Sequence, residues 1–391
     1  MDRINNKNLK SFIKEVKMVE QERRNKTPLK KSMIIDTIER KSSYIPACYN
    51  WIAQATILNK GYEILNLLRK YPDDIIAIDP FPVFIGYKSA EGIKDEDFFK
   101  LINYEFINKD YKWIDEWGVK MQYKKNTVGA SAFDFPLKNW DSFDKYIKNQ
   151  MPKGSNSERL SGAKEQINKI ENAENKYIIG NLIFFLFERA QFLRGAENFL
   201  TDLYINEKMA NLLLRELTNY NLEMVEEWAK LNVNAIFMTD DWGTQTNMII
   251  SPDLWKKFFK PYYIEIFNCV HKNNMHVIFH SCGAVTKIIG ELIEIGIDVL
   301  HPIQPVCNDY NYIAKKFGKD LTVMGGIDVQ KILPNGTKDE IKESLYEFAE
   351  IFSHNRCGVI FYPTNSIVPD TPLENIELAF ETVKEIKSNI Q

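Results

Sequence analysis

A histidine and a cysteine two residues apart are the most chemically specific feature of the sequence. His280 and Cys282 close the apolar run HVIFHSC, which spans residues 276–282. On an extended chain, residues i and i+2 point to the same side, so an imidazole and a thiol would project together. Zn²⁺ prefers nitrogen and sulfur ligands, so this pattern predicts a metal site that needs a third ligand from elsewhere. The alternative is that His280 hydrogen-bonds within the core while Cys282 packs as a small hydrophobic residue.

Two adjacent carboxylates form a second candidate site. Asp240 ends the apolar run NAIFMTD, Asp241 follows it, and Gln245 lies in the same loop. Neighbouring side chains on an extended chain point in opposite directions, so one carboxylate can face a site while the other fixes the loop. The carboxylate at the site would act as a general acid or base, bind a metal or recognise a cation. The alternative is that both aspartates accept hydrogen bonds from turn amides.

Polar residues at the ends of other apolar runs complete the set of candidates. The paired glycines before Asp328 allow a ligand to approach the backbone closely at Gly326, although a tight turn with Asp328 capping the next helix is the simpler interpretation. Glu188 lies early in a helix and could reach the same region, but we expect an exposed residue in an ion pair. The remaining candidates at the ends of apolar runs are Asp79, Asn181, Gln304 and Asn365.

Eight short apolar runs alternate with long amphipathic stretches and predict how these residues are positioned. The runs span residues 44–51, 74–79, 177–182, 234–240, 276–282, 299–304, 321–328 and 358–364. Strands that alternate with helices indicate a parallel sheet, and near-continuous apolar strands indicate burial on both faces. We therefore predict an α/β fold, a (β/α)8 TIM barrel with an insertion between its second and third strands; a doubly wound open sheet is the alternative. In a barrel, the candidate residues meet at the face where the strands end.

The polar, basic N-terminus and the overall composition indicate the domain organisation, the partners that are not expected and the cellular location. We predict an N-terminal helical arm over residues 1–32 and a barrel over residues 33–391. Charged residues make up 26% of the chain and its net charge is −3, so neither a nucleic acid nor an anionic membrane is an expected partner. The five cysteines are widely spaced, which is typical of reduced thiols. With no signal peptide and no long apolar run, we expect a cytoplasmic protein.

Taken together, the motifs resemble those of a known superfamily. The order DDWGTQ, ISPDLWKKFFKPYY, HVIFHSCGAV, IEIGIDVLHPIQP, FGKDLTVMGGIDVQKILPNGT and PDTPLENI resembles the uroporphyrinogen decarboxylase superfamily. Within it, the sequence looks most similar to the branch of methylcobamide:thiol (coenzyme M-type) methyltransferases. The resemblance covers roughly residues 33–390 and implies a (β/α)8 barrel, in agreement with the pattern of apolar runs.

The decarboxylases of this superfamily need no cofactor, and the resemblance implies how they bind their substrate. Arginines near the first strand and an aspartate after the second strand hold a pyrrole ring system that carries several carboxylates. In this sequence Asp79 matches the aspartate, but residues 44–56 contain no arginine. Without these cations the carboxylates would lose their charge-assisted hydrogen bonds. Decarboxylation of uroporphyrinogen itself is therefore not expected.

The methyltransferases of the superfamily hold Zn²⁺ with a His-x-Cys pair after the fifth strand and a further thiolate after the last strand. His280 and Cys282 match the pair, whereas the last position falls on Asn365, whose amide oxygen is a poor zinc ligand beside a thiolate. Either a different residue supplies the third ligand, for which Cys307, Asp241 and Glu188 are the candidates, or there is no catalytic zinc.

The resemblance thus implies methyl transfer that uses zinc and a corrinoid carried by a separate partner protein. The small-molecule donor or acceptor would be a thiol, tetrahydrofolate, a methylated amine or an ether. We predict catalytic roles for Asp79, Asp240 and Asp241, substrate binding by Asn181, Gln245, Gln304, Gly326, Asp328 and Asn365, and metal binding by His280, Cys282 and Cys307. A metal-free carboxy-lyase acting on a smaller carboxylated substrate and a non-catalytic binding protein are the alternatives. The sequence leaves a monomer and a homodimer open.

Overall fold

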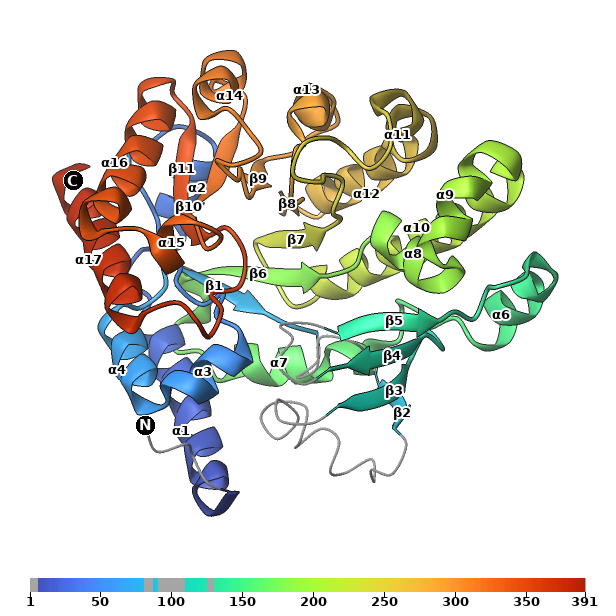
Figure 1. The fold of residues 1–391 in the computed structure, drawn as a ribbon, viewed down its shortest axis with the longest axis horizontal. Coiled ribbons are helices and arrows are strands. Elements are labelled where there is room, and N and C mark those ends of the chain that lie inside the picture. Colours follow the sequence, from blue (N-terminus) through green and yellow to red (C-terminus); the bar gives the residue numbers. More distant parts are fainter. Residues whose placement is uncertain (1–5, 81–86, 91–109, 125–129, 391) are drawn as a thin grey trace.

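A curled parallel sheet forms the centre of the protein in the computed structural model, which describes residues 6–80, 87–90, 110–124 and 130–390 (Figure 1). Its seven strands are β1 (Ile75–Ile78), β6 (Tyr177–Leu182), β7 (Ala235–Thr239), β8 (His276–His280), β9 (Val299–His301), β10 (Thr322–Ile327) and β11 (Gly358–Pro363). They pair in this order, so each strand lies beside the next parallel strand along the chain. The predicted α/β barrel is confirmed, and these strands fall within seven of the eight apolar runs.

The eighth place in the barrel is taken by the segment 46–52, between β11 and β1. Ala47 forms a parallel bridge with Phe361 of β11. The Cys48 amide donates to the Phe361 carbonyl at 2.9 Å, and the Asp74 amide, just before β1, donates to the Ala47 carbonyl at 2.9 Å. The expected first strand is therefore a bridge that closes the barrel through single residues instead of a regular strand.

Side-chain carboxylates explain why this segment does not pair regularly with β1. Asp74 accepts a hydrogen bond from the Ala47 amide at 2.7 Å, and Asp73 accepts one from the Tyr49 amide at 2.6 Å. Two backbone amides that would otherwise pair with the backbone of β1 thus donate to side-chain carboxylates instead. Both carboxylates are buried and carry ion pairs, Asp74 with Lys387 of the C-terminal helix and Asp73 with Arg23 of the N-terminal helix at 2.9 Å.

The interior of the barrel is filled by apolar side chains that alternate along the strands. These inward-facing residues include Cys48, Ile75, Tyr177, Ile179, Ala235, Phe237, Ile278, Val299, Met324, Ile360 and Tyr362. Because inward positions recur every second residue, the residues two places beyond Ile278 and Val299 also face inward. These residues are His280 and His301, which are paired in register at the ends of β8 and β9.

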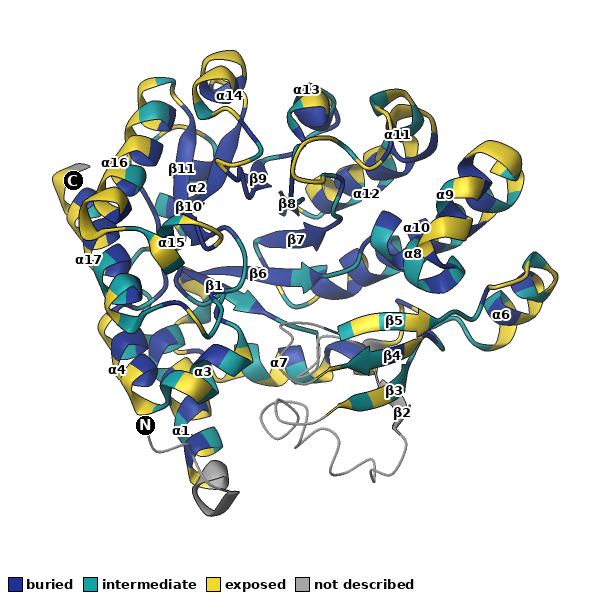
Figure 2. Cartoon of the chain, viewed as in Figure 1, coloured by how far each residue is buried: buried dark blue, intermediate teal, exposed yellow. Residues whose placement is uncertain are grey.

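Helices surround the sheet, with buried inner faces and exposed outer faces (Figure 2). They are α8 (Phe187–Arg194), α9 (Ala196–Ile205), α10 (Glu207–Ala229), α11 (Pro252–Phe258), α12 (Lys260–Lys272), α13 (Ile289–Glu294), α14 (Tyr310–Phe317), α15 (Ile332–Asn335), α16 (Lys338–His354) and α17 (Leu373–Ile390). Their starts follow sequence signals: the Ser251 hydroxyl caps α11 ahead of Pro252, and Thr337 and Glu340 form a capping box at α16.

The N-terminal part of the chain is helical and packs against the barrel. It comprises α1 (Asn6–Asn25), α2 (Lys31–Ile38), α3 (Gln54–Lys60) and α4 (Tyr62–Lys70). In α1, Phe12, Val16 and Val19 recur at helical spacing and are buried, so this helix adds to the apolar core.

A second sheet lies in the insertion between β1 and β6. Its antiparallel strands are β2 (Tyr87–Ala90), β3 (Tyr111–Asp115), β4 (Lys120–Tyr123) and β5 (Ala130–Asp134). The insertion itself was expected, but its sheet was not. Between β5 and β6 lie α6 (Phe143–Asn149), α7 (Ser161–Asn168) and the 3₁₀ turns η2 (Trp140–Ser142), η3 (Ser157–Leu160) and η4 (Ala173–Asn175). A further turn, η5 (Thr286–Ile288), precedes α13.

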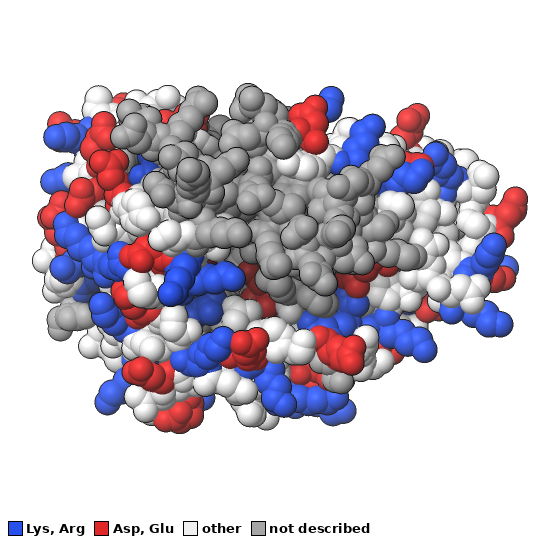
Figure 3. Space-filling model, turned by 90° about the horizontal axis from the view of Figure 1, so that it is seen from below, with Lys and Arg blue, Asp and Glu red and all other residues white. Residues whose placement is uncertain are grey.

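Acidic and basic side chains are interspersed over the described part of the face seen in Figure 3, in keeping with the near-neutral balance of charges. Among the described helices, none combines the length and the apolar character needed to cross a lipid bilayer.

The buried ion pair of Arg23 gives a test of barrel closure. In Arg23→Met, the Asp73 carboxylate stays buried without its cation, so we expect the free energy of unfolding to fall by about 3 kcal/mol. Lys169→Met is the matched control, because it removes an exposed ion pair with Glu165 and should change stability very little. Denaturant titration of the three proteins measures the difference, and equal midpoints for both variants would contradict the role of Arg23.

Candidate metal centre

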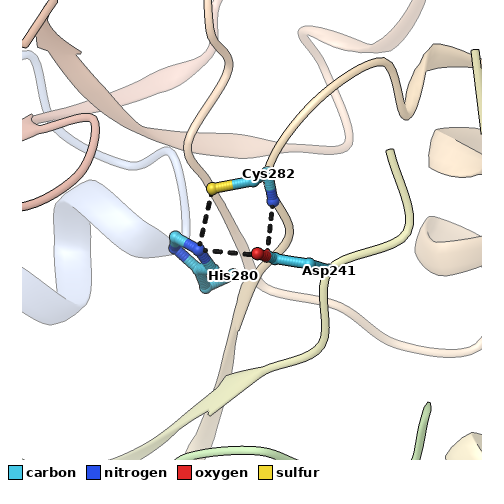
Figure 4. Close-up of side chains that lie close together, drawn as sticks. All are labelled: Asp241, His280 and Cys282. Atoms are coloured by element: carbon cyan, nitrogen blue, oxygen red, sulfur yellow. Dashed lines mark hydrogen bonds and ion pairs between the residues drawn. The ribbon is translucent and has the colours of Figure 1, made fainter. Parts of the chain in front are cut away.

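Three side chains with metal-binding atoms converge at the carboxyl end of β7 and β8. The imidazole Nε2 of His280 lies 3.3 Å from Asp241 Oδ1 and 3.3 Å from Cys282 Sγ. The three side chains point toward one another in Figure 4, and one ligand atom from each lies within 4.8 Å of the other two. Within the part of the chain that the structure describes, this is the one such group of three or more.

The parallel register of β7 and β8 brings these residues together. Thr239 pairs with His280, so the chain beyond each strand continues side by side. The Asp240 amide donates to the His280 carbonyl at 3.0 Å, and the Cys282 amide donates to Asp241 Oδ1 at 2.9 Å. Asp241 therefore fixes the backbone of the cysteine as well as facing its side chain.

Two glycines allow the loops after β7 and β8 to touch. A Cβ placed on Gly283 would lie 2.3 Å from the backbone of Gly243, and a Cβ on Gly243 would lie 2.4 Å from the amide nitrogen of Ala284. Gly283 also has a φ of +82°, which side-chain-bearing residues rarely adopt. Close backbone contact between the loops thus depends on both glycines.

The charges at the cluster fit a bound cation. Burial alone would raise the pKa of Asp241, but hydrogen bonding and attraction to His280, together with the Cys282 amide, lower it below its ordinary value. Burial and the adjacent Asp241 charge raise the pKa of the Cys282 thiol far above its usual range. A divalent cation reverses this effect, because a coordinating thiol loses its proton. One nitrogen, one sulfur and one oxygen atom therefore meet at a point where the negative charge of Asp241 would stabilise a divalent cation.

Asp240 points away from this cluster and caps a helix. Its carboxylate accepts hydrogen bonds from the amides of Leu186, Phe187 and Glu188 at 2.8–3.1 Å and from the Tyr263 hydroxyl. These amides begin α8, whose unpaired N–H groups favour a negative charge. Burial raises the pKa of Asp240 to about 7, and the hydrogen bonds oppose that rise. As expected for adjacent aspartates, Asp241 faces the cluster, while Asp240 binds backbone amides.

Glu188 differs from the expectation of an exposed residue in an ion pair. It is only partly accessible, and the Thr239 hydroxyl donates to its Oε2 at 3.4 Å. Burial, together with the charges of Asp241 and Asp240, raises the pKa of Glu188 well above its ordinary value. The expectation was wrong because the first turn of α8, held by Asp240, turns this side chain inward.

Three further predicted residues lie at the ends of neighbouring strands. Asn365 follows β11, and its amide Nδ2 donates to Cys282 Sγ at 3.4 Å. Asn181 donates to Asp79 at 2.7 Å across the ends of β6 and β1, and burial raises the pKa of Asp79. Asn365 thus touches the cluster, whereas the pair of Asp79 and Asn181 lies outside the group of three.

Three predicted residues lie in the loops around the cluster without joining it. Gln304 accepts a hydrogen bond from the Gly283 amide at 2.6 Å and so supports the loop that carries Cys282. Cys307 Sγ donates to Gln245 Oε1 at 3.3 Å and lies outside the group of three ligands.

Gly326 and Asp328 at the end of β10 have structural roles, which is the simpler of the two interpretations of the sequence. Asp328 accepts hydrogen bonds from the amides of Gln330 and Ile332 at 2.9 and 3.3 Å, just before α15. A Cβ on Gly326 would lie 2.5 Å from the ring of Phe348, so this glycine serves helix packing.

Two residues that were not among the predicted site residues contact the cluster. The Nδ1 atoms of His280 and His301 are 2.7 Å apart, and His301 is completely buried. Trp51, from the segment that closes the barrel, lies with its ring centroid 5.1 Å from each of the two imidazole rings. A sequence signal could have identified His301. His301 lies two residues after the inward-facing Val299, just as His280 lies two residues after the inward-facing Ile278.

The fold and the site together define an α/β-barrel protein with a candidate metal centre at the ends of its strands. A family model described as "Uroporphyrinogen decarboxylase (URO-D)" matches residues 114–386. The chain therefore belongs to the uroporphyrinogen decarboxylase family, which confirms the resemblance seen in the sequence.

Similar proteins within this family carry out different reactions. The chain is 22% identical over 204 residues to a "Methylated-thiol--coenzyme M methyltransferase" of Methanosarcina mazei, covering 51% of each protein, so the match spans about half of that relative. It is 24% identical to a "Uroporphyrinogen decarboxylase" of Hydrogenobaculum sp., covering 89% of this chain and 86% of that protein. Homologues thus include methyltransferases and decarboxylases.

A solved structure shares the fold. The methyltransferase from Methanosarcina mazei superposes with a TM-score of 0.53 and 17% identity, over 69% of this chain and 76% of that chain. At this identity the likeness supports the barrel architecture alone.

Gly283 gives a test of the contact between the two ligand-bearing loops. In Gly283→Ala, the strained φ and the clash with Gly243 should together lower the free energy of unfolding by about 4 kcal/mol. Gly61→Ala is the matched control, because its φ of +62° is also positive but nothing lies within 4 Å of the added Cβ. It should lose only about 2 kcal/mol from backbone strain. Thermal and chemical denaturation would disprove the close contact if both variants lost the same stability.

Proposed function

We propose that this chain is a zinc-dependent methyltransferase that moves a methyl group between a corrinoid on a separate protein and a small molecule. The convergence of Asp241, His280 and Cys282 is the observation that carries the proposal. Zinc in catalytic sites takes three protein ligands and keeps a fourth position for water or substrate. A mixed set with an imidazole and a thiolate favours zinc, whereas Mg²⁺ and Ca²⁺ prefer oxygen ligands.

The contacts of Asn365 support Asp241 as the third ligand. Asn365 presents its Nδ2–H group to the Cys282 sulfur, and its Oδ1 accepts from the Ser366 amide at 2.6 Å. Its oxygen is thus engaged and its nitrogen has no lone pair to offer a metal. Asp241 supplies instead an anionic oxygen 3.3 Å from His280 Nε2.

The proposed roles of the residues follow from these contacts. When bound, zinc would supply the positive charge that keeps a substrate thiol, or a comparable nucleophile, in its deprotonated form for methyl transfer. His280, Cys282 and Asp241 would hold the metal, and Asn365 would orient the cysteine sulfur. Gln304 and Gly283 would keep the cysteine loop in place through the hydrogen bond between them.

Zinc content is the first measurement to make. We expect about one zinc per chain in the wild type and its loss in Asp241→Ala, His280→Ala and Cys282→Ala. Cys307→Ala is the matched control, because it removes a thiol outside the group of three and should retain zinc. Elemental analysis after dialysis gives the stoichiometry. A wild-type protein that contains no zinc when freshly purified, and takes none up when zinc is added, would disprove the proposal.

Methyl transfer itself can be followed with free methylcobalamin as a substitute for the corrinoid partner. The zinc-loaded wild type should consume methylcobalamin in the presence of an acceptor thiol, as seen in the visible absorbance of the corrinoid, and Cys282→Ala should not. Cys307→Ala serves again as the control that retains activity.

A carboxy-lyase acting on a small carboxylated substrate is the second candidate. It is favoured by the family match and by Asp79, which is held by Asn181 at the end of β1. The absence of arginine from residues 44–56 argues against a substrate as highly charged as uroporphyrinogen. Release of carbon dioxide by metal-free protein that lacks methyl-transfer activity would favour this candidate over the first.

A further inference from the structure

Two imidazole rings meet edge to edge behind the candidate metal centre. His280 and His301 are inward-facing partners in the register of β8 and β9, and their Nδ1 atoms are 2.7 Å apart. On its other side, His301 Nε2 lies 3.1 Å from the carbonyl oxygen of Pro363 at the end of β11. A chain of hydrogen bonds therefore runs from Pro363 through His301 to His280.

The chemistry of these groups decides which atom donates and which accepts in each of these hydrogen bonds. A carbonyl oxygen can only accept, so His301 Nε2 must carry a proton. A neutral His301 then has a lone pair on Nδ1, and the short contact requires His280 Nδ1 to carry the proton between the rings. The reverse arrangement needs a cationic His301. That cation would be completely buried beside a neutral ring and a carbonyl, without a carboxylate among its hydrogen-bond partners, which is a costly arrangement.

Aromatic rings hold His301 in this position. Trp51 stacks on its face with an interplanar angle of 28° and a centroid distance of 5.1 Å. Tyr362 approaches edge-on at 5.1 Å, and Phe237 lies at 5.6 Å. The ring is thus packed on several sides and cannot easily turn away from His280.

We infer that His301 is a positioning residue that keeps a proton on Nδ1 of His280 and so points its Nε2 toward Asp241 and Cys282, where a metal would bind. The inference concerns the same centre as the proposed function and rests on that function for its effect on zinc, although the hydrogen bond between the two imidazole rings is present without metal. Metal-binding histidines usually donate their second N–H to a carboxylate, a backbone carbonyl or water. Here a second histidine accepts that hydrogen bond and relays it to Pro363.

The tautomer can be read directly in metal-free protein. Protein labelled with ¹⁵N in its histidine rings gives long-range ¹H–¹⁵N spectra that separate protonated from unprotonated nitrogens. The chain has five histidines, so single variants assign the signals. We expect the proton on Nδ1 of His280 and on Nε2 of His301. A wild-type His280 without a proton on Nδ1 would overturn the inference.

Two substitutions of His301 separate positioning from simple packing. His301→Phe keeps a ring but removes the acceptor, so the His280 signals should change toward the Nε2–H tautomer. His301→Gln keeps one acceptor and one donor end, so it should preserve the Nδ1–H tautomer. His354→Phe is the control, because His354 lies on α16 and bonds the Glu350 carbonyl. An unchanged His280 tautomer in a folded His301→Phe protein would overturn the inference.

Zinc affinity gives the second readout. By chelator competition, His301→Phe should bind zinc roughly 10- to 100-fold more weakly than wild type, while His301→Gln should regain most of the affinity. The visible spectrum of the cobalt-substituted proteins should change in parallel. Wild-type zinc affinity in His301→Phe would overturn the positioning role. Failure of the wild type to bind zinc would disprove the proposed function, and the tautomer spectra would still decide the inference about His301.

Discussion

Closure of the barrel depends on two buried carboxylates that bind backbone amides. Asp73 and Asp74 hold the segment 46–52 through the amides of Tyr49 and Ala47, and their charges are balanced by cations from the first and last helices. The site depends on this closure, because the same segment contains Trp51, which lies against both imidazole rings. Contacts far apart in the chain thus complete the mouth of the barrel.

The parts of the fold that depend on local sequence patterns could be predicted. Seven apolar runs became strands because fully buried strands show as continuous apolar segments. The first run forms single-residue bridges, since its amides are bound by the side chains of Asp73 and Asp74, a long-range effect that no local pattern contains. The second sheet escaped prediction because its short strands mix polar and apolar residues, so no continuous apolar run marks them.

The proximity of His280 and Cys282 could be predicted from their spacing along the chain. The choice of Asp241 from three possible ligands required the register of β7 against β8, which sequence alone leaves open. Glu188 was misjudged because its burial follows from the cap that Asp240 places on α8. His301 needed the register of β8 against β9, although its inward position could have been read from alternation within its own strand.

In the proposed centre, Asp241 in place of a second thiolate would preserve the charge of the ligand set while changing its chemical character. Within the resemblance noted in the sequence, two thiolates and one histidine would hold the metal; here one thiolate, one carboxylate and His280 converge. Both sets carry two negative charges, so either would neutralise a divalent cation. A carboxylate oxygen is a harder ligand than sulfur, so it leaves more positive charge on the metal for the fourth ligand. The proposed centre would therefore favour loss of the proton from a bound thiol more than one with two thiolates, and the hydrogen bond from His280 to His301 would keep Nε2 of His280 directed at the metal.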